Sequence, residues 1–248
     1  MLVLLSPAKT MKHKEYLGKT RDPLFGDMTQ IIVREFQKLS LPEIRQWYQI
    51  SEKIAQQTWA HWQSFYEQPK TIALYAYQGE AYRNLDATSM TASQIKKADR
   101  HLRILSACYG LLRPLDKIAM YRLDFTKNFP SIGNGITYWK STINDALVEE
   151  INMHSAKIIV NCASDEYSKM IDTVRIKRLI GWIDVEFVYI QDNKPVSIAM
   201  HAKAARGTLA RALIENPITS IRQMNRYLPD YTCEIDSHSS KVTYTRKL

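Results

Sequence analysis

The chain has 248 residues, of which 45% are hydrophobic and 24% charged, a composition that indicates a folded globular protein rather than a disordered one. Lysine and arginine total 34 against 25 acidic residues, so the formal net charge is +9 and favours an anionic partner such as nucleic acid or a nucleotide. No apolar run is long enough for a membrane-spanning helix, and the first residues, MLVLLSPAKT, lack the basic start of a secretory signal. We therefore expect a cytoplasmic protein without a membrane partner.

The first quarter of the chain predicts a strand, a loop and then helices. Residues 2–5 are a short continuous apolar run, which is typical of a buried strand, and residues 11–27 form a basic loop. Between residues 28 and 68, apolar residues recur at helical spacing, and Ser40 and Ser51 are suited to cap helices. We expect three helices there, as a helical insertion in which Trp47, Trp59 and Trp62 serve core packing.

Alternating strands and helices are expected over the rest of the chain. They are a strand at 71–76, a helix at 91–101, a helix at 138–154, a strand at 158–160, a hairpin of 185–190 with 196–199, a helix at 201–215 and a strand at 242–245. This order predicts an α/β or α+β fold with a central mixed sheet surrounded by helices. The absence of repeats and linkers favours a single domain over residues 1–248.

The stretch from His101 to Phe125, HLRILSACYGLLRPLDKIAMYRLDF, places three arginines around a turn at Tyr109 and Gly110. Guanidinium groups match phosphates and aromatic rings stack on bases, so Arg103, Arg113 and Arg122 with Tyr109 are candidates for nucleic-acid contact. The alternative is that some of these arginines pair internally with Asp116 and Asp124.

Small polar residues follow two of the expected strands, in Ser6-Pro7-Ala8-Lys9-Thr10 and in Asn161–Tyr167. Ligands of α/β proteins sit beside strand ends, and a serine with a lysine can bind phosphate or form an activated nucleophile. Lys9, Ser6, Asp165 and Glu166 are therefore the candidates for catalysis, although capping of a helix by Ser164 explains the second segment equally well.

On the helix expected at 201–215, Lys203, Arg206 and Arg211 fall within an arc of about 140°. Gly207 lies inside this arc, where the missing side chain would allow a close approach to the helix backbone. The same three cations are also consistent with a solvated face. We select them, with Lys9 and the arginines of the central stretch, as candidates for anion binding.

No cofactor or metal site is expected. Neither GxGxxG nor a P-loop occurs, the histidines are scattered, and the three cysteines show no zinc spacing. The cysteines should be reduced thiols. For Cys108 two interpretations stay open, a buried core thiol or an oxidisable thiolate whose pKa is lowered by basic neighbours.

Five segments together resemble the YaaA family of bacterial peroxide-stress proteins, in the family's order and over the whole chain. They are LVLLSPAKT, YQGEAY, LRILSACYGLLRPLD with MYRLDF, NCASDEY, and KAARG with LARALIEN. The resemblance implies a cytoplasmic protein that limits iron-linked damage by hydrogen peroxide. It also implies an unusual α/β topology with a basic cleft and a helix-hairpin-helix-like element that binds double-stranded DNA. That element would fall on the central stretch, with its turn at Tyr109-Gly110.

Two functions follow. The first is binding of DNA, with little sequence preference, through Lys9, Arg103, Arg113, Arg122, Lys203 and Arg206. The second is an enzyme acting on a nucleotide or other anionic small molecule, in a pocket lined by Ser6–Thr10 and Asn161–Tyr167.

Overall fold

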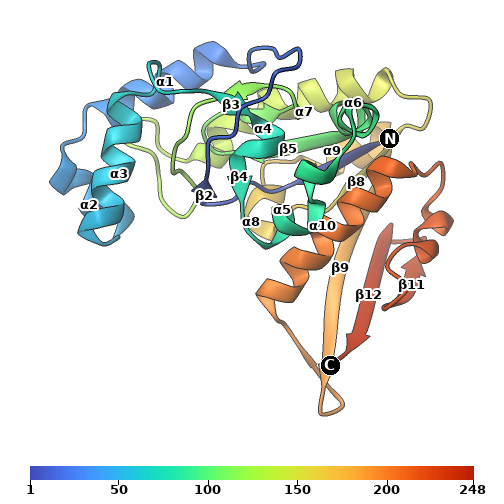
Figure 1. The fold of residues 1–248 in the computed structure, drawn as a ribbon. Helices are drawn as coiled ribbons and strands as arrows, with labels where there is room; N and C mark the ends of the chain where they lie inside the picture. The colour runs from blue at the N-terminus through green and yellow to red at the C-terminus, as the bar shows by residue number, and fades with distance from the viewer.

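A computed structural model describes residues 1–248, and its first strand lies in the middle of an eight-stranded sheet (Figure 1). Across the sheet the order is β11-β12-β9-β8-β1-β5-β6, and β10 pairs with β9. The strands are β1 (Leu2–Leu5), β5 (Leu102–Ser106), β6 (Gly110–Leu112), β8 (Ile158–Asn161), β9 (Gly181–Gln191), β10 (Lys194–Val196), β11 (Thr232–Asp236) and β12 (Lys241–Lys247). The predicted central mixed sheet is confirmed.

β1 is parallel to both of its neighbours, β5 and β8. β8, β9 and β12 continue the parallel part, whereas β6, β10 and β11 are antiparallel additions. All four residues of β1 are buried, which explains why Leu2–Leu5 is a continuous apolar run without polar alternation.

Helices surround this sheet. The larger ones outside the helical insertion are α6 (Ala92–His101), α7 (Gly135–Asn152) and α10 (Ala199–Glu215); the shorter ones are α4 (Ala73–Ala76), α5 (Glu80–Leu85), α8 (Asp165–Ser168) and α9 (Thr173–Leu179). Two 3₁₀ turns, Ala87–Ser89 and Ile221–Arg226, complete the set. α6 and α10 contact each other and β1. None of these helices combines the length and apolar character needed to cross a membrane.

The helices predicted between residues 28 and 68 are α1 (Gly26–Gln37), α2 (Leu41–Tyr48) and α3 (Glu52–Gln63). Ser40 is the residue before α2, as the sequence suggested, and its backbone N–H donates to Glu43 Oε2 at 2.8 Å. Phe36 of α1 stacks on the buried Trp62 of α3, with 4.7 Å between the ring centroids. Trp59 remains 37% exposed, so the prediction of core packing is wrong for this tryptophan.

The central stretch is a β-hairpin of β5 and β6, so a helix-hairpin-helix at this place is wrong. Gly110 opens β6 with φ of +72°, and a Cβ at this position would lie 2.7 Å from the ring of Trp139. Both facts require glycine here for packing rather than for a phosphate contact.

Two short strand pairs were not anticipated correctly. The strand expected at 71–76 is two residues long, β3 (Thr71–Ile72), and gives way to α4. It pairs with β7 (Lys117–Ile118), while β2 (Thr10–Met11) pairs with β4 (Tyr77–Gln78). A hairpin was predicted here, but its second strand, β10, covers Lys194–Val196 rather than 196–199, and the turn is Asp192 and Asn193 alone, with φ of 52° and 59°.

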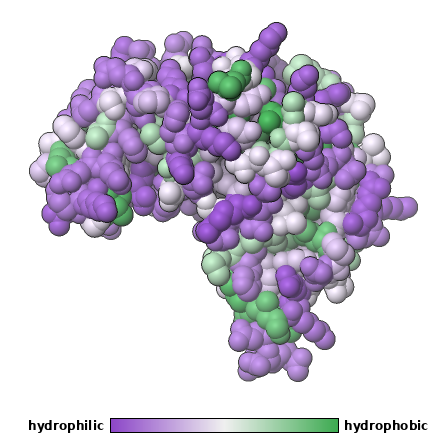
Figure 2. Space-filling view, in the orientation of Figure 1, coloured by the Kyte–Doolittle hydropathy of each residue, from purple (hydrophilic) through white to green (hydrophobic).

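The molecule is bent (Figures 1 and 2). The helices α1–α3 project on one side and the strands β9, β12 and β11 with the start of α10 on another, and the surface between them is hollowed. In Figure 2 the helical side of this hollow is mainly hydrophilic, whereas the lower lobe carries hydrophobic atoms beside hydrophilic ones.

Candidate functional site

A pocket of about 580 Å³ lies at the carboxyl ends of β1 and β8. We call it the strand-end pocket. Its walls come from the segment after β1, the start of α5, the residues Leu123 and Asp124, the segment after β8, and the first two turns of α10. In the sheet, β1 lies between β5, which pairs with one of its edges, and β8, which pairs with the other. In open parallel sheets, ligands bind in the crevice at such a reversal of strand order.

Ser6 and Ser164 join the two strand ends. The backbone N–H of Ser164 donates to Ser6 Oγ at 2.8 Å, and the two hydroxyl oxygens lie 3.1 Å apart. The phenol of Tyr82, from α5, donates to the carbonyl oxygen of Ser6 at 2.9 Å. Ser6 therefore helps to hold the pocket wall, and the hydrogen bonds of its hydroxyl group are both to Ser164.

Lys9 lies at the pocket with its ammonium group 2.8 Å from Asp124 Oδ2. Burial alone would raise the pKa of Asp124, but hydrogen bonds from Lys9 and Thr126 outweigh it and hold the pKa below its ordinary value. Asp124 is thus a carboxylate at neutral pH and orients Lys9, whose side chain is 57% exposed.

Each acidic side chain of the pocket already has a partner. Asp124 has Lys9, Glu80 has Arg83 at 2.5 Å, and Glu166 accepts a hydrogen bond from the backbone N–H of Phe125 at 3.1 Å. Two cations of the pocket, Lys203 and Arg206, have no carboxylate partner.

Arg206 is held by neutral groups. Its guanidinium donates to the carbonyl oxygen of Ala163 and lies over the ring of Phe187, 5.9 Å from the centroid. Lys203, one turn earlier on α10, is exposed. The positive charge available to a ligand in this pocket therefore concentrates on the α10 wall.

Asp165 and Glu166 do not act as a pair. Glu166 lines the pocket, whereas Asp165 is exposed and outside the lining. Ser164 is the first residue before α8, in agreement with the structural alternative that the sequence left open. The catalytic hypothesis for Asp165 has no geometric support.

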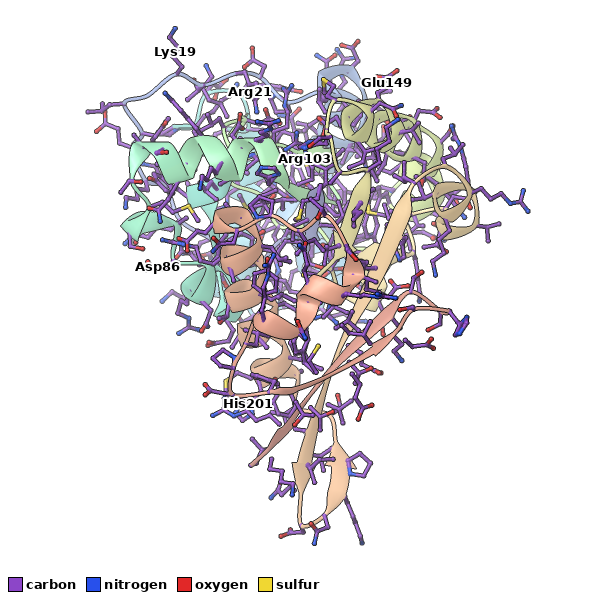
Figure 3. All side chains as sticks on the ribbon, turned by 90° about the vertical axis from the view of Figure 1, so that its right-hand side faces the viewer. Lys19, Arg21, Asp86, Arg103, Glu149 and His201 are labelled. Carbon is purple, nitrogen blue, oxygen red and sulfur yellow. The ribbon has the colours of Figure 1, made fainter.

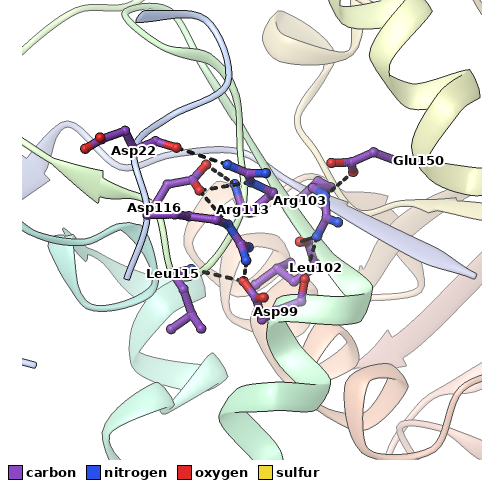
Figure 4. A network of polar contacts seen from close by, with 9 residues as sticks. Asp22, Asp99, Leu102, Arg103, Arg113, Leu115, Asp116 and Glu150 are labelled. Carbon is purple, nitrogen blue, oxygen red and sulfur yellow. Dashed lines mark hydrogen bonds and ion pairs between the residues drawn. The ribbon is translucent and has the colours of Figure 1, made fainter. Parts of the chain in front are cut away.

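Arg103 is buried in the interior, so the prediction that it contacts an external anion is wrong (Figures 3 and 4). Its guanidinium pairs with Glu150 of α7 and donates to the carbonyl oxygens of Asp99 and Leu102, the former at 2.8 Å. Tyr109 and Gly110 are buried as well, and the Tyr109 phenol accepts from the backbone N–H of Ala119. None of these three can reach DNA.

Arg113 belongs to a second internal network (Figure 4). It donates to the fully buried carboxylate of Asp116 at 2.9 Å, and Arg21 binds the same oxygen at 3.1 Å. Burial raises the pKa of Asp116 despite these two partners. For Arg113 the structure therefore contains the alternative considered from the sequence, an internal ion pair with Asp116.

Arg211 and Gly207 hold α10 against α5. Arg211 pairs with Glu215 and donates to the carbonyl oxygens of Leu85 and Asp86, at 3.1 and 2.8 Å. A Cβ on Gly207 would lie 1.9 Å from the carbonyl oxygen of Ala81. The close approach expected at Gly207 is made by another part of this chain, and it sets two walls of the strand-end pocket.

Two aromatic residues of the pocket, Tyr82 and Tyr167, were not selected from the sequence, although both lie in the motifs quoted above. Their assignment to the pocket requires knowing which strand ends meet.

Cys108 and Cys162 are buried, and burial raises the pKa of Cys108 well above that of a free thiol and the pKa of Cys162 to about 12. The interpretation of Cys108 as a reactive thiolate is wrong.

Comparison with known proteins identifies the family. The family described as peroxide stress protein YaaA matches residues 1–234. The chain belongs to the YaaA family. A protein of Francisella philomiragia described as a UPF0246 protein is 30% identical over 258 aligned positions, and the alignment covers 99% of this chain and all of that protein. UPF0246 proteins of Bacteroides thetaiotaomicron and Crocosphaera subtropica are 32% and 30% identical, over 92% of this chain and 90% and 92% of theirs. The resemblance carried by the motifs is confirmed, and the family's name supports a role in peroxide stress.

Proposed function

We propose that this protein acts in the peroxide-stress response of the cytoplasm by binding double-stranded DNA along its hollowed face, through phosphate contacts with little sequence preference. The proposal rests on five cations, Lys127, Arg122, Lys9, Lys203 and Arg206, whose segments connect the helical insertion to the strand-end pocket. We call them the cation row.

Contacts between distant segments support this row. The Lys127 ammonium donates to the carbonyl oxygen of Trp47 in α2, and the Tyr48 phenol donates to the carbonyl oxygen of Arg122. Two residues later the same segment reaches Lys9 through Asp124. Lys203 and Arg206 continue the row on α10. A net charge of +9 adds long-range attraction to the phosphate backbone.

A protein that occupies DNA in this way would limit peroxide damage at the covered sites, and any link to iron would be indirect. Because phosphate contacts carry no sequence information, we expect similar affinity for unrelated duplexes. We expect strong salt dependence, since each phosphate contact releases counterions.

The test is the variant Lys9→Ala, Arg122→Ala, Lys203→Ala, with affinity for a fluorescent duplex measured at several salt concentrations. Each lost phosphate contact should reduce the slope of log K against log salt by about 0.9. The matched control removes three exposed cations elsewhere, Lys19, Lys96 and Arg100, of which Lys19 lies at the top edge of the molecule in Figure 3. An equal loss of slope in both variants would refute the cation row.

The strand-end pocket favours a second function, an enzyme or binding protein for a nucleotide or other anionic small molecule. DNA binding by itself needs no pocket of about 580 Å³ at a reversal of strand order. Competition of a mononucleotide with the duplex, at micromolar concentration, would support this function.

A further inference from the structure

We propose that the strand-end pocket holds one nucleotide unit, with its base against an apolar wall and its phosphate beside Lys203 and the start of α10. The unit is either a free mononucleotide or a nucleotide turned out of bound DNA. The second source rests on the proposed function, and the first does not.

One wall of the pocket is apolar and well packed. Leu5, Tyr82, Leu123 and Tyr167, which line this wall, are each at most 7% exposed. Burial raises the pKa of both phenols well above the ordinary value, so both rings stay neutral at physiological pH. A nucleobase, with flat faces of low polarity, matches such a wall better than a sugar phosphate or a bare inorganic anion does.

The opposite wall suits a phosphate. Lys203 and Arg206 have no carboxylate partner, and Ala199 and Met200 place the first turn of a 17-residue helix at the pocket. Ile198, before this helix, provides no side-chain cap, so the first backbone N–H groups of α10 remain available. Cations together with free amides of a helix start form a site for a phosphate monoester or diester.

Polar groups on the remaining rim can read a base edge. The side chain of Gln78 lies at the end of β4 and that of Glu80 at the start of α5, and the hydroxyl groups of Ser6 and Ser164 lie at the ends of β1 and β8. These provide both hydrogen-bond donors and acceptors, as the Watson–Crick edge of a base requires.

The size of the pocket limits the ligand. A volume of about 580 Å³ lies within the range of small-molecule sites, about 300–1,000 Å³, and is too small for a duplex. If DNA lies on the cation row, only a nucleotide that has left the base stack can enter. The pocket and the row share Lys9, Lys203 and Arg206, which brings the two sites into contact.

The experiment compares wild type with Ala199→Trp, which fills the pocket from an exposed position, and with Ala60→Trp, the same change at an exposed position of α3. One arm titrates the free mononucleotides by calorimetry. The other uses a duplex with 2-aminopurine at a single-base bulge, because the fluorescence of this base rises when it leaves the stack. Duplex affinity is measured for all three proteins.

We expect A199W to weaken nucleotide binding, or to suppress the fluorescence rise, by about tenfold or more, and A60W to change neither. Duplex affinity should fall by less than about threefold in A199W, since Lys9, Arg122 and Lys127 are retained.

If a free nucleotide binds wild type but not A199W, the ligand of the pocket is a free mononucleotide, and this holds even if the duplex does not bind and the proposed function fails. A fluorescence rise that A199W abolishes identifies the second source. If DNA binds tightly while wild type shows neither signal, or if A199W retains both, the nucleotide pocket is refuted and DNA binding stands.

Discussion

The backbone N–H of Ser164 donates a hydrogen bond to the Ser6 hydroxyl at 2.8 Å, although the two residues are 158 positions apart. This contact joins the ends of two neighbouring parallel strands, and through Tyr82 it also joins α5 to them. Removal of this hydrogen bond should weaken the pocket wall without creating a cavity in the hydrophobic core.

For Ser6→Ala we expect a loss of about 1 kcal/mol in the free energy of unfolding, because a half-buried amide loses its acceptor. Urea denaturation measures it. Ser93→Ala, at an exposed helix position without a side-chain hydrogen bond, is the control and should change stability by less than about 0.5 kcal/mol. Equal effects at both positions would argue against a structural role for the Ser6 hydroxyl.

The contact between Gly207 and Ala81 predicts a larger effect. A methyl group on Gly207 would overlap the Ala81 carbonyl, so Gly207→Ala should cost about 3 kcal/mol by forcing α10 away from α5. Gly26→Ala is the matched control, since a Cβ there meets nothing within 4 Å. Thermal unfolding of both variants tests this, and a stable G207A would mean that the two helices separate at little cost.

The buried ion pair of Arg103 and Glu150 predicts that a single substitution lowers the free energy of unfolding more than a double substitution does. Glu150→Gln should destabilise the fold by about 3–5 kcal/mol, because it leaves a buried guanidinium without its carboxylate. The double change Arg103→Met, Glu150→Leu should recover most of this loss. If the double variant folds, its DNA affinity should equal that of wild type, whereas a specific loss of affinity would return Arg103 to the anion-binding set.

His154 predicts a dependence of stability on pH. Burial, followed by the positive charges of the chain's amino group, His101, Arg103 and Arg100, lowers its pKa to about 4 from 6.5. Between about pH 6.5 and 4, His154 is therefore protonated in the unfolded chain and neutral in the folded chain. The free energy that the neutral His154 contributes to folding is complete above pH 6.5 and is lost as the pH falls towards 4.

At about 1.4 kcal/mol for each tenfold change in proton affinity, the loss from His154 should reach about 2–3 kcal/mol. Unfolding free energies at pH 7 and pH 4.5 measure it, and His154→Gln should remove much of the difference. His101, whose pKa burial also lowers, keeps part of the slope in that variant. A slope that is unchanged in His154→Gln would assign the effect to other groups.

Thiol labelling provides a further prediction. Cys108 and Cys162 are buried with raised pKa values, while Cys233 is only partly buried. Iodoacetamide should therefore modify Cys233 before the other two in the folded protein, as mass spectrometry of the peptides would show. Early modification or peroxide oxidation of Cys108 would revive a sensing role.

Much of the local structure could be predicted because its signals are local. Ser40 with Glu43 and Thr91 with Gln94 are capping boxes readable from sequence spacing, and Asp192–Asn193 is a two-residue hairpin turn. The segments at Ser6 and Ser164 were selected because small polar residues follow expected strands there and ligands of α/β proteins sit beside strand ends, and the structure brings the two segments together.

The errors concern partners that are distant in the sequence. Arg103 interrupts an apolar strand, and nothing near it shows that Glu150, on another helix, neutralises it. Gly207 in mid-helix signals a close approach without saying what approaches. The clustering of Lys203 with Lys9 depends on the packing of α10 beside β1, which helical periodicity cannot indicate.

The central place of β1 also determines the order in which the sheet can be assembled during synthesis. Leu2–Leu5 are made first, but their pairing partners end at Ser106 and Asn161. At about 5–20 residues per second, the ribosome needs roughly 8–30 s to make the second of these partners. Throughout that time the apolar strand Leu2–Leu5 has at least one unpaired edge, which is the kind of exposed surface that aggregates or binds chaperones before folding is complete.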